Sequence, residues 1–373
     1  MNMRQKAGLR ELFCHCLGGT FAVPDIVGGA LVVAAQTEGV GSLFSFRMLN
    51  RDDWHDAGEM RSYLNEVLHE QAAWSLRIRH TARQVFEALN RAGIPFVCMR
   101  GIAVVEELYG DMAPLRPVSD IDILLDEALM LDAKQVLWDI GFRPDQTYRN
   151  IYSRGEMHID LHHEPLGIER IQAWQYLTPL RREDFFRYSE AGELADEKAL
   201  LVHPRVNLPY LCFHAMKHSF ERLIWLYDIA LLANRVGEES RWSEVFEGIR
   251  EQRLERPCFY ALSYVNAHLG ASVPEDLLES IRPGMGFIER TLFKRHMRHE
   301  VIPYLAERLF ARMQPDLRHR IEFWRETIYP RHEVRAQMVQ TGCVKCNFIR
   351  KRLKQLFRAA WLLTKEGLYL LRA

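Results

Sequence analysis

The run LRPVSDIDILL at residues 115–125 carries the clearest structural pattern in the chain. Its alternation predicts a strand over 118–125. Because successive side chains point to opposite faces, Asp120 and Asp122 share one face, with their Cα atoms ~6.6 Å apart. The apolar residues Ile121, Ile123 and Leu125 then face the core. Adjacent carboxylates repel unless a cation lies between them, and oxygen ligands favour Mg²⁺ or Mn²⁺. The alternative is a solvated strand end that binds no metal.

A second strand is predicted over residues 157–162, which read MHIDLH. Its alternation places His158, Asp160 and His162 on one face. If this strand pairs with the first, Asp160 becomes a third carboxylate beside Asp120 and Asp122. Three such groups hold two divalent ions ~3.5–4 Å apart, which suits phosphoryl or nucleotidyl transfer, with Asp160 placed to accept a proton. A transition-metal site that includes the two histidines is the alternative.

The segments around these strands predict a small α/β unit. The apolar run 94–99 predicts a buried strand, and Arg100 and Gly101 follow it before a helical pattern that ends near Gly110. A glycine at this point lets a helix begin close to a phosphate, with its N–H groups directed at the anion. The remaining elements of the unit are a helix over 127–140 and a hairpin of strands over 147–153 and 157–162.

Helical patterns flank this unit on both sides. Segments 62–68 and 72–92 precede it and segments 208–220 and 223–235 follow it, with apolar residues three and four positions apart. Prolines in the second half indicate joints between helices, at Pro204, Pro209, Pro257, Pro274, Pro283 and Pro315. The predicted domains are an N-terminal helical region (1–90), a central domain (91–200) and a C-terminal helical domain (201–373).

Taken together, the motifs resemble those of a known family. The pair Arg100-Gly101, the segment 107–109 and the run 115–124 resemble the nucleotidyltransferase superfamily typified by DNA polymerase β. Within it, the chain is most similar to a bacterial family of uncharacterised nucleotidyltransferases, through segments 141–142, 158–162, 211–218 and 223–228 as well. The resemblance spans roughly residues 30–235. Arg100 stands where that family usually has Lys, and it keeps the charge while adding a planar fork suited to phosphate.

The resemblance implies a fold of the α+β class, a polymerase-β-like palm of a small mixed sheet with helices, flanked by N- and C-terminal helical regions. It implies that Asp120 and Asp122 bind the metals and that Asp160 completes the catalytic triad, with Mg²⁺ or Mn²⁺ as cofactor. The implied reaction moves a nucleoside monophosphate, AMP from ATP, to a hydroxyl acceptor and releases pyrophosphate. Two alternatives stay open: a non-catalytic binding protein with a palm fold, and an AMPylating toxin or regulator that acts on a protein.

Six residues are assigned to the nucleotide: Arg100, Gly101, Ser119, Arg116, Lys217 and His214. Arg116 and Ser119 adjoin the acidic strand, where a structural role in the turn is the alternative. Lys217 is expected to reach the phosphates with His214 assisting, or else His214 packs in the core while Lys217 is solvated. The aromatic residues Trp225 and Tyr227 either stack on a base or belong to the core.

The composition of the chain restricts its partners. With 49 Lys+Arg and 49 Asp+Glu in 373 residues, the chain has no basic field to gather a long nucleic acid. No run reaches the ~20 apolar residues of a membrane span, and seven cysteines favour a reducing cytoplasm. A zinc site that joins Cys14 and Cys16 to Cys343 and Cys346 is disfavoured by their separation. The basic amphipathic tail from Lys345 either contacts a membrane surface or packs on the protein.

Overall fold

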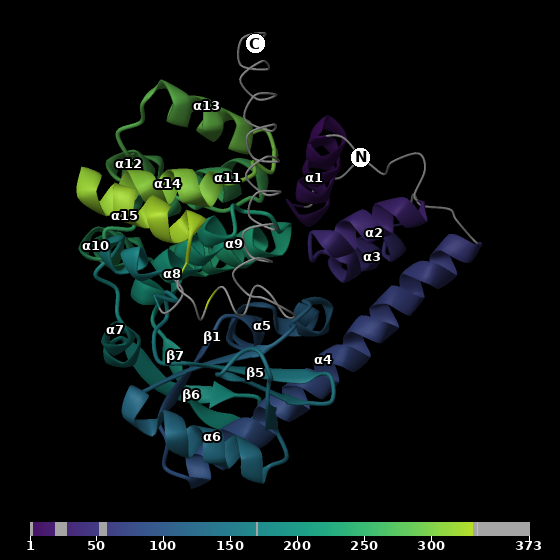
Figure 1. Cartoon of the computed structure of the whole chain (residues 1–373). Helices are drawn as coiled ribbons and strands as arrows, with labels where there is room; N and C mark the ends of the chain where they lie inside the picture. The colour runs from purple at the N-terminus through teal and green to yellow at the C-terminus, as the bar shows by residue number, and fades with distance from the viewer. Residues whose placement is uncertain (1–2, 19–27, 52–57, 169–170, 331–333, 335–373) are drawn as a thin grey trace.

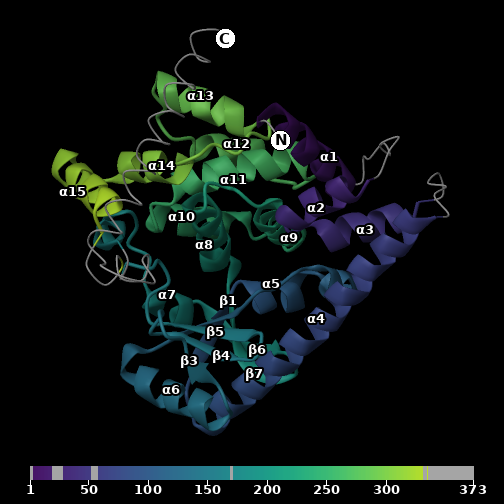
Figure 2. The same ribbon diagram turned by 45° about the vertical axis from the view of Figure 1, so that its right-hand side comes forward.

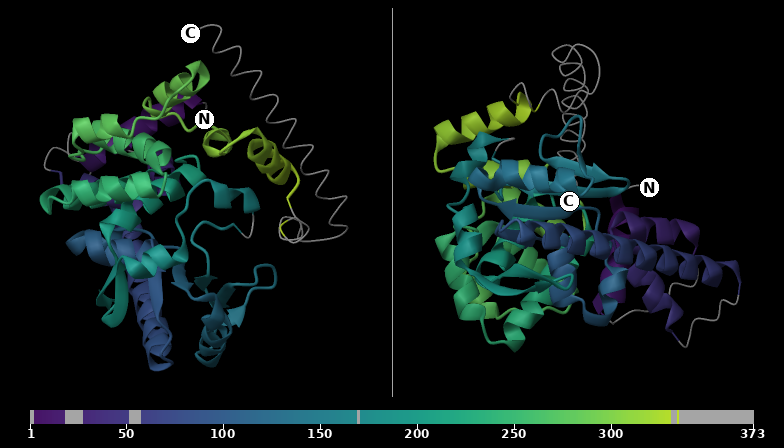
Figure 3. Two further views of the ribbon diagram at one scale, coloured as in Figure 1. Left: turned by 90° about the vertical axis from the view of Figure 1, so that its left-hand side faces the viewer. Right: turned by 90° about the horizontal axis from the view of Figure 1, so that it is seen from below.

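The structure, a computed structural model, describes residues 3–18, 28–51, 58–168, 171–330 and 334. Within these residues a mixed seven-stranded sheet lies at one end of the molecule, and most of the helices lie at the other (Figure 1). Helices α4 and α6 lie on the side of the sheet away from the later helices, as two further views make clear (Figures 2 and 3). The α+β class predicted from the sequence is confirmed.

The sheet has the strand order β3-β4-β5-β2-β1-β7-β6. Its strands are β1 (Phe96–Met99), β2 (Ile121–Leu125), β3 (Arg143–Pro144), β4 (Ile151–Arg154), β5 (Met157–His162), β6 (Ser189–Leu194) and β7 (Glu197–Val202). Strand β2 pairs antiparallel with β1 and parallel with β5. The two strands that carry the predicted acids are therefore neighbours at the middle of the sheet.

The hairpin of β6 and β7 is absent from the sequence-based prediction. Its two-residue turn is formed by Ala195 and Asp196, both with positive φ (52° and 64°). Such turns are usually signalled by Asn-Gly or Asp-Gly, and Ala-Asp gives no such signal. The hairpin extends the sheet because β7 pairs parallel with β1, where Leu200 lies opposite Val97.

The helices are α1 (Met3–Gly18), α2 (Gly29–Thr37), α3 (Gly41–Leu49), α4 (Glu59–Arg91), α5 (Gly101–Leu108), α6 (Met130–Asp139), α7 (Arg182–Arg187), α8 (Pro204–Lys217), α9 (Leu223–Glu238), α10 (Trp242–Glu251), α11 (Glu255–His268), α12 (Glu275–Ser280), α13 (Phe287–His296), α14 (Leu305–Met313) and α15 (Leu317–Ile328). The segments predicted at 62–68 and 72–92 join into the single 33-residue helix α4.

Two hydrophobic cores lie on opposite faces of the sheet. One core joins α4 and α6 to the sheet face that carries Ile121, Ile123 and Leu125, as the alternation in the sequence predicts. The other core contains Leu124 from the opposite face together with most of the helical part of the chain. Asp122 lies on the same face as Leu124, so its carboxylate is directed toward the helices. This placement puts the acids between the sheet and the helical part.

One predicted joint is wrong, because Pro209 lies inside α8 and does not end it. Proline has no N–H to donate to the carbonyl four residues earlier, which in this helix belongs to Arg205. The side-chain amide of Gln252 donates to that carbonyl oxygen at 3.3 Å. A tertiary contact thus satisfies the group that proline leaves without its helical donor.

None of the helices among the described residues is long and apolar enough to cross a bilayer. The basic tail from Lys345, with Cys343 and Cys346, lies outside the described residues, so its predicted membrane or packing role stays a prediction. The cysteines that the structure describes are buried thiols, namely Cys14, Cys16, Cys98, Cys212 and Cys258.

Candidate functional site

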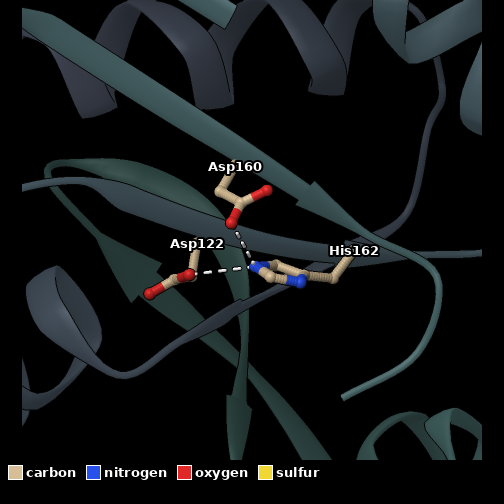
Figure 4. A group of neighbouring side chains, drawn as sticks. All are labelled: Asp122, Asp160 and His162. Atoms are coloured by element: carbon tan, nitrogen blue, oxygen red, sulfur yellow. Dashed lines mark hydrogen bonds and ion pairs between the residues drawn. The ribbon is translucent and has the colours of Figure 1, made fainter. Parts of the chain in front are cut away.

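Strands β2 and β5 place two of the predicted acids side by side. Asp122 and Asp160 are register partners in the parallel pairing of these strands. His162, two residues further along β5, directs its ring between them (Figure 4). Its Nε2 atom lies 2.9 Å from Asp122 Oδ1 and 3.3 Å from Asp160 Oδ2. Ligand atoms of the three side chains all lie within 4.8 Å of one another, which makes them a candidate metal site.

Asp122 is the most deeply buried of the predicted acids, with 6% of its surface exposed. Arg100 Nη2 donates to its Oδ1 at 2.6 Å, and His162 Nε2–H donates to the same oxygen. Burial alone would raise the pKa of Asp122, but the charge of Arg100 and the hydrogen bond from His162 outweigh it and lower the pKa to about 2. Asp122 is therefore an anion across the physiological pH range.

In contrast to Asp122, Asp160 and Asp120 have raised pKa values, because at these two acids burial outweighs the nearby positive charge. Burial raises the pKa of Asp160 to about 6, even though His162 acts to lower it. Burial and the charge of Asp122 raise the pKa of Asp120 as well. The carboxylate of Asp120, which directly precedes β2, accepts a hydrogen bond from Ser119 Oγ at 2.7 Å. Asp120 thus adjoins the group formed by the other two acids and His162 without being one of its members.

Arg100 links the sheet to the helical part of the molecule. It sits between β1 and α5 with a positive φ (56°), which non-glycine residues rarely adopt, and Gly101 also has positive φ (43°). A side chain at Gly101 would come within 3.4 Å of the carbonyl oxygen of Asp120, so the start of α5 lies against the acidic strand. Arg100 Nη1 donates to His214 Nδ1 at 2.5 Å. Burial and the charge of Arg100 hold the pKa of His214 well below its usual value, so this histidine is a neutral acceptor.

The segment that leads into β2 is fixed from two sides. Arg116 Nη2 lies 2.6 Å from Asp228 Oδ2 on α9, and Tyr109 Oη donates to Asp228 Oδ1 at 2.7 Å. From α4, Trp74 Nε1 donates to the carbonyl oxygen of Val118, and Gln71 donates to that of Arg116. The buried guanidinium of Arg116 therefore forms an ion pair with Asp228, and this pair positions the acidic strand. Its assignment to the nucleotide stays a prediction, and its observed contacts are structural.

The acids open into a cleft of about 1770 Å³ between the sheet and the helices. Every residue assigned to the nucleotide from the sequence lines it, including Lys217 and His214 of α8. Lys217 Nζ donates to the carbonyl oxygen of Leu166 at 3.3 Å and lies over the ring of Trp174. Trp225 also lines the cleft, whereas Tyr227 is buried and packs edge-on against Tyr109.

The donor set of this site fits a divalent cation. Carboxylate oxygens suit Mg²⁺ or Mn²⁺, and a single imidazole is compatible with Mn²⁺ and with other transition metals. His158 is not part of the group, because it is exposed and its Nδ1 is paired with Ser153 Oγ at 2.8 Å. The transition-metal site with both histidines is therefore not assembled in this part of the chain.

Metal affinity is expected to depend on pH through Asp160. A carboxyl group must lose its proton before it binds a cation, and the pKa of Asp160 is about 6. The affinity for Mn²⁺ should therefore be nearly constant above pH ~7 and fall by up to about tenfold per pH unit below pH ~6. Titration of free Mn²⁺ by electron paramagnetic resonance measures this. Asp160→Asn should bind more weakly and lose the inflection, and equal wild-type affinities at pH ~5 and pH ~7.5 would contradict the assignment.

Three features of the site carry no local sequence signal. Asp228 lies far from the acidic strand in the chain and only packing shows that it pairs with Arg116. Gln71 and Trp74 belong to a helix whose pattern indicates nothing beyond amphipathicity. Arg222 lines the cleft from a loop position before α9. Only the recurrence of these residue types in related sequences would have indicated them beforehand.

Comparison with known proteins identifies a family. The family model described as "Uncharacterised nucleotidyltransferase" matches residues 29–270, which include the whole sheet and the helices that line the cleft. No curated protein and no solved structure matches the chain.

Proposed function

The chain belongs to the uncharacterised nucleotidyltransferase family, and on that premise we propose that it transfers AMP from ATP to a hydroxyl acceptor and releases pyrophosphate. Membership supports nucleotidyl transfer as the activity, which makes the protein an enzyme that uses a nucleoside triphosphate. The observation that carries the proposal is the register of β2 and β5, which sets Asp122 opposite Asp160 at the floor of a large cleft.

The three acids have different roles in the proposed reaction. Asp122, Asp160 and Asp120 would hold divalent cations, with Asp122 as the ligand that stays ionised at all working pH values. Bound there, a divalent cation would supply charge stabilisation for the transferring phosphate and lower the pKa of the acceptor hydroxyl. Asp160, whose pKa is about 6, accepts the proton of that hydroxyl. The acceptor oxygen then forms a bond to the α-phosphorus as the bond to the bridging oxygen of pyrophosphate breaks.

The residues at the start of α5 bind the phosphates. The backbone N–H groups of this helix point toward an anion placed at its N-terminus, and Gly101, which carries no Cβ, lets the start of the helix lie close against Val118 and the carbonyl oxygen of Asp120. Arg100 lies between Asp122 and His214 and offers its planar fork to phosphate oxygens. His214, held neutral, orients that fork by accepting one of its N–H groups.

The size of the cleft supports two substrates bound together. Pockets for one drug-sized ligand measure roughly 300–1,000 Å³, whereas this cleft measures about 1770 Å³. A nucleoside triphosphate leaves space there for an acceptor with a hydroxyl group. A small molecule and the side chain of a protein both fit this description, and the acceptor decides whether the enzyme modifies a metabolite or regulates a protein.

The test is a search for nucleotide addition. The protein is incubated with each of the four common nucleoside triphosphates, Mg²⁺ or Mn²⁺, and a cell extract separated into small molecules and proteins. We expect a mass gain of one AMP on a species in one fraction, together with pyrophosphate release that needs the metal. Asp160→Asn should lower this rate by about 10²–10⁴-fold if Asp160 is the base. If the protein instead binds nucleoside triphosphate without metal and without turnover, and Asp160→Asn binds it equally well, the result would support the non-catalytic alternative.

A further inference from the structure

Arg222, which lines the cleft, differs from Arg100 and Arg116 because it has no acidic partner among the described residues. Arg100 pairs with Asp122 and Arg116 pairs with Asp228. The guanidinium of Arg222 lies over the ring of Trp225, 5.7 Å from its centroid, and lines the cleft. Within the described part of the chain, no carboxylate lies within ion-pair distance of it, and no side-chain hydrogen bond involves it. In the described structure this half-buried cation at the cleft wall therefore has no carboxylate in direct contact with it.

The electrostatic surroundings of Arg222 agree with its contacts. Burial and the charge of Arg116 lower the pKa of Arg222, and Glu38, Asp228 and Asp120 compensate only in part. An arginine stays protonated at neutral pH in spite of such a shift. Its surroundings thus favour an additional negative charge, which a bound anion supplies.

The N-terminal helices hold the backbone of Arg222 in place. Arg222 directly precedes α9, and the turn between α2 and α3 accepts the first N–H groups of that helix. Glu38 Oε2 accepts from Leu223 N at 2.9 Å, and the Glu38 carbonyl oxygen accepts from Ile224 N at 3.1 Å. A Cβ at Gly39 would come within 2.9 Å of Arg222 Nη2, so this glycine leaves the space that the guanidinium uses. Figure 2 shows α2 beside α9.

The position of Arg222 relative to the acids indicates which anion it receives. Arg222 and Asp120 line the same cleft. Among Asp120, Asp122 and Asp160, Asp120 has the largest effect on the pKa of Arg222, although Glu38 and Asp228 raise that pKa more. Asp120 lies against the start of α5, where the carbonyl oxygen of Asp120 faces Gly101. That end of the site is the phosphate end of the proposed reaction, whereas Asp160, the proposed base, marks the acceptor end. A cation on the helical side near Asp120 is suited to phosphates beyond the reacting one.

We propose that Arg222 binds the β- or γ-phosphate of the nucleoside triphosphate, so that the triphosphate bridges the sheet and the helical part, and that Glu38 is a positioning residue for it. This inference rests on the proposed function, which supplies the identity of the nucleotide. It assigns a role in substrate binding to the N-terminal helices, which contribute neither to the sheet nor to the acid group.

The test compares ATP with AMP, which lacks the β- and γ-phosphates. Binding of each to wild type and to Arg222→Gln is measured by isothermal titration calorimetry in the presence of Mg²⁺. A hydrogen bond between charged groups predicts that ATP binding weakens about 10- to 100-fold while AMP binding is unchanged. Arg222→Lys should retain part of the affinity. The matched control is Arg235→Gln, which changes an arginine of α9 that is paired with Glu239 and should bind both ligands as the wild type does.

Unchanged ATP binding in Arg222→Gln, or an equal loss of affinity for ATP and AMP, would overturn the inference. Inorganic tripolyphosphate separates this inference from the proposed function. If the wild type turns over no nucleotide yet binds tripolyphosphate through Arg222, the function fails and the phosphate site stands. If the wild type is active and Arg222→Gln binds ATP normally, the phosphate site fails alone. Binding of neither ATP nor tripolyphosphate by the wild type also refutes it.

A double-mutant comparison tests the positioning role of Glu38. Glu38→Ala should weaken ATP binding by a smaller factor than Arg222→Gln and leave AMP binding unchanged. Added to Arg222→Gln, it should have little further effect on ATP binding, because its action passes through Arg222. If Glu38 has only a structural role, the loss of ATP affinity in Glu38→Ala should add fully to that of Arg222→Gln in the double variant, or Glu38→Ala should lower the affinity for AMP as well.

Discussion

Asp122→Asn is expected to lower the rate of nucleotidyl transfer by about a thousandfold or more. A metal that stabilises the charge of the transferring phosphate contributes several kcal/mol, and each ~1.4 kcal/mol changes the rate about tenfold. Asp122 is the acid that is always ionised and lies opposite Asp160. Asparagine keeps the oxygen that accepts from Arg100 and His162, so the variant should stay folded. Pyrophosphate release with the wild-type acceptor, and Mn²⁺ titration of the same samples, measure the effect.

Two controls make the result on Asp122 specific. Asp126→Asn, directly after β2 and exposed, removes an acid outside the metal group and should leave the rate unchanged. Circular dichroism and the thermal midpoint establish that each variant is folded. Full Mn²⁺ affinity and full activity in folded Asp122→Asn would remove the metal-dependent mechanism from this site, because Asp122 is the acid of the metal group that is most buried and has the lowest pKa.

Asp228→Ala is expected to destabilise the protein by about 3–5 kcal/mol, since it leaves the buried guanidinium of Arg116 without its counter-charge. Both side chains are almost completely buried, with 8% and 3% of their surfaces exposed. The substitution also removes the acceptor of the Tyr109 hydroxyl. Because this pair fixes the segment before β2 against α9, the loss should also lower activity. Urea unfolding followed by tryptophan fluorescence and far-UV circular dichroism measures the change.

Replacement of the whole pair separates charge from packing. The double variant Arg116→Met with Asp228→Leu removes both charges and should recover a large part of the lost stability, as buried ion pairs often tolerate apolar replacement. Glu239→Ala, which breaks the exposed pair with Arg235, should change stability by less than ~1 kcal/mol. A loss of under ~1 kcal/mol in Asp228→Ala would show that solvent or another group compensates Arg116 in the folded protein.

The predictions that succeed depend on local periodicity. The alternation in 118–125 and 157–162 sends apolar side chains to one face of the sheet, and both core assignments are confirmed. The resemblance to the family is confirmed by the match over 29–270. The hairpin of β6 and β7 escapes prediction because its Ala-Asp turn has positive φ at two residues without the usual glycine. A local pattern therefore predicts an element only where the residue types within that element are the ones that usually accompany its backbone geometry.

The sequence by itself determined the placement of Asp122 and Asp160 on their strands and of Gly101 before a helix, because each follows from neighbours a few residues apart. The α+β class followed from the resemblance that the motifs carry. Only the tertiary structure decided that β5 pairs with β2 in the register that sets Asp160 opposite Asp122. It also decided that His162 and Arg100 share Asp122, that Asp228 neutralises Arg116, and that Arg222 is left without an acidic partner in the described structure. These relations join residues far apart in the chain, and the packing of the whole fold sets which charges meet.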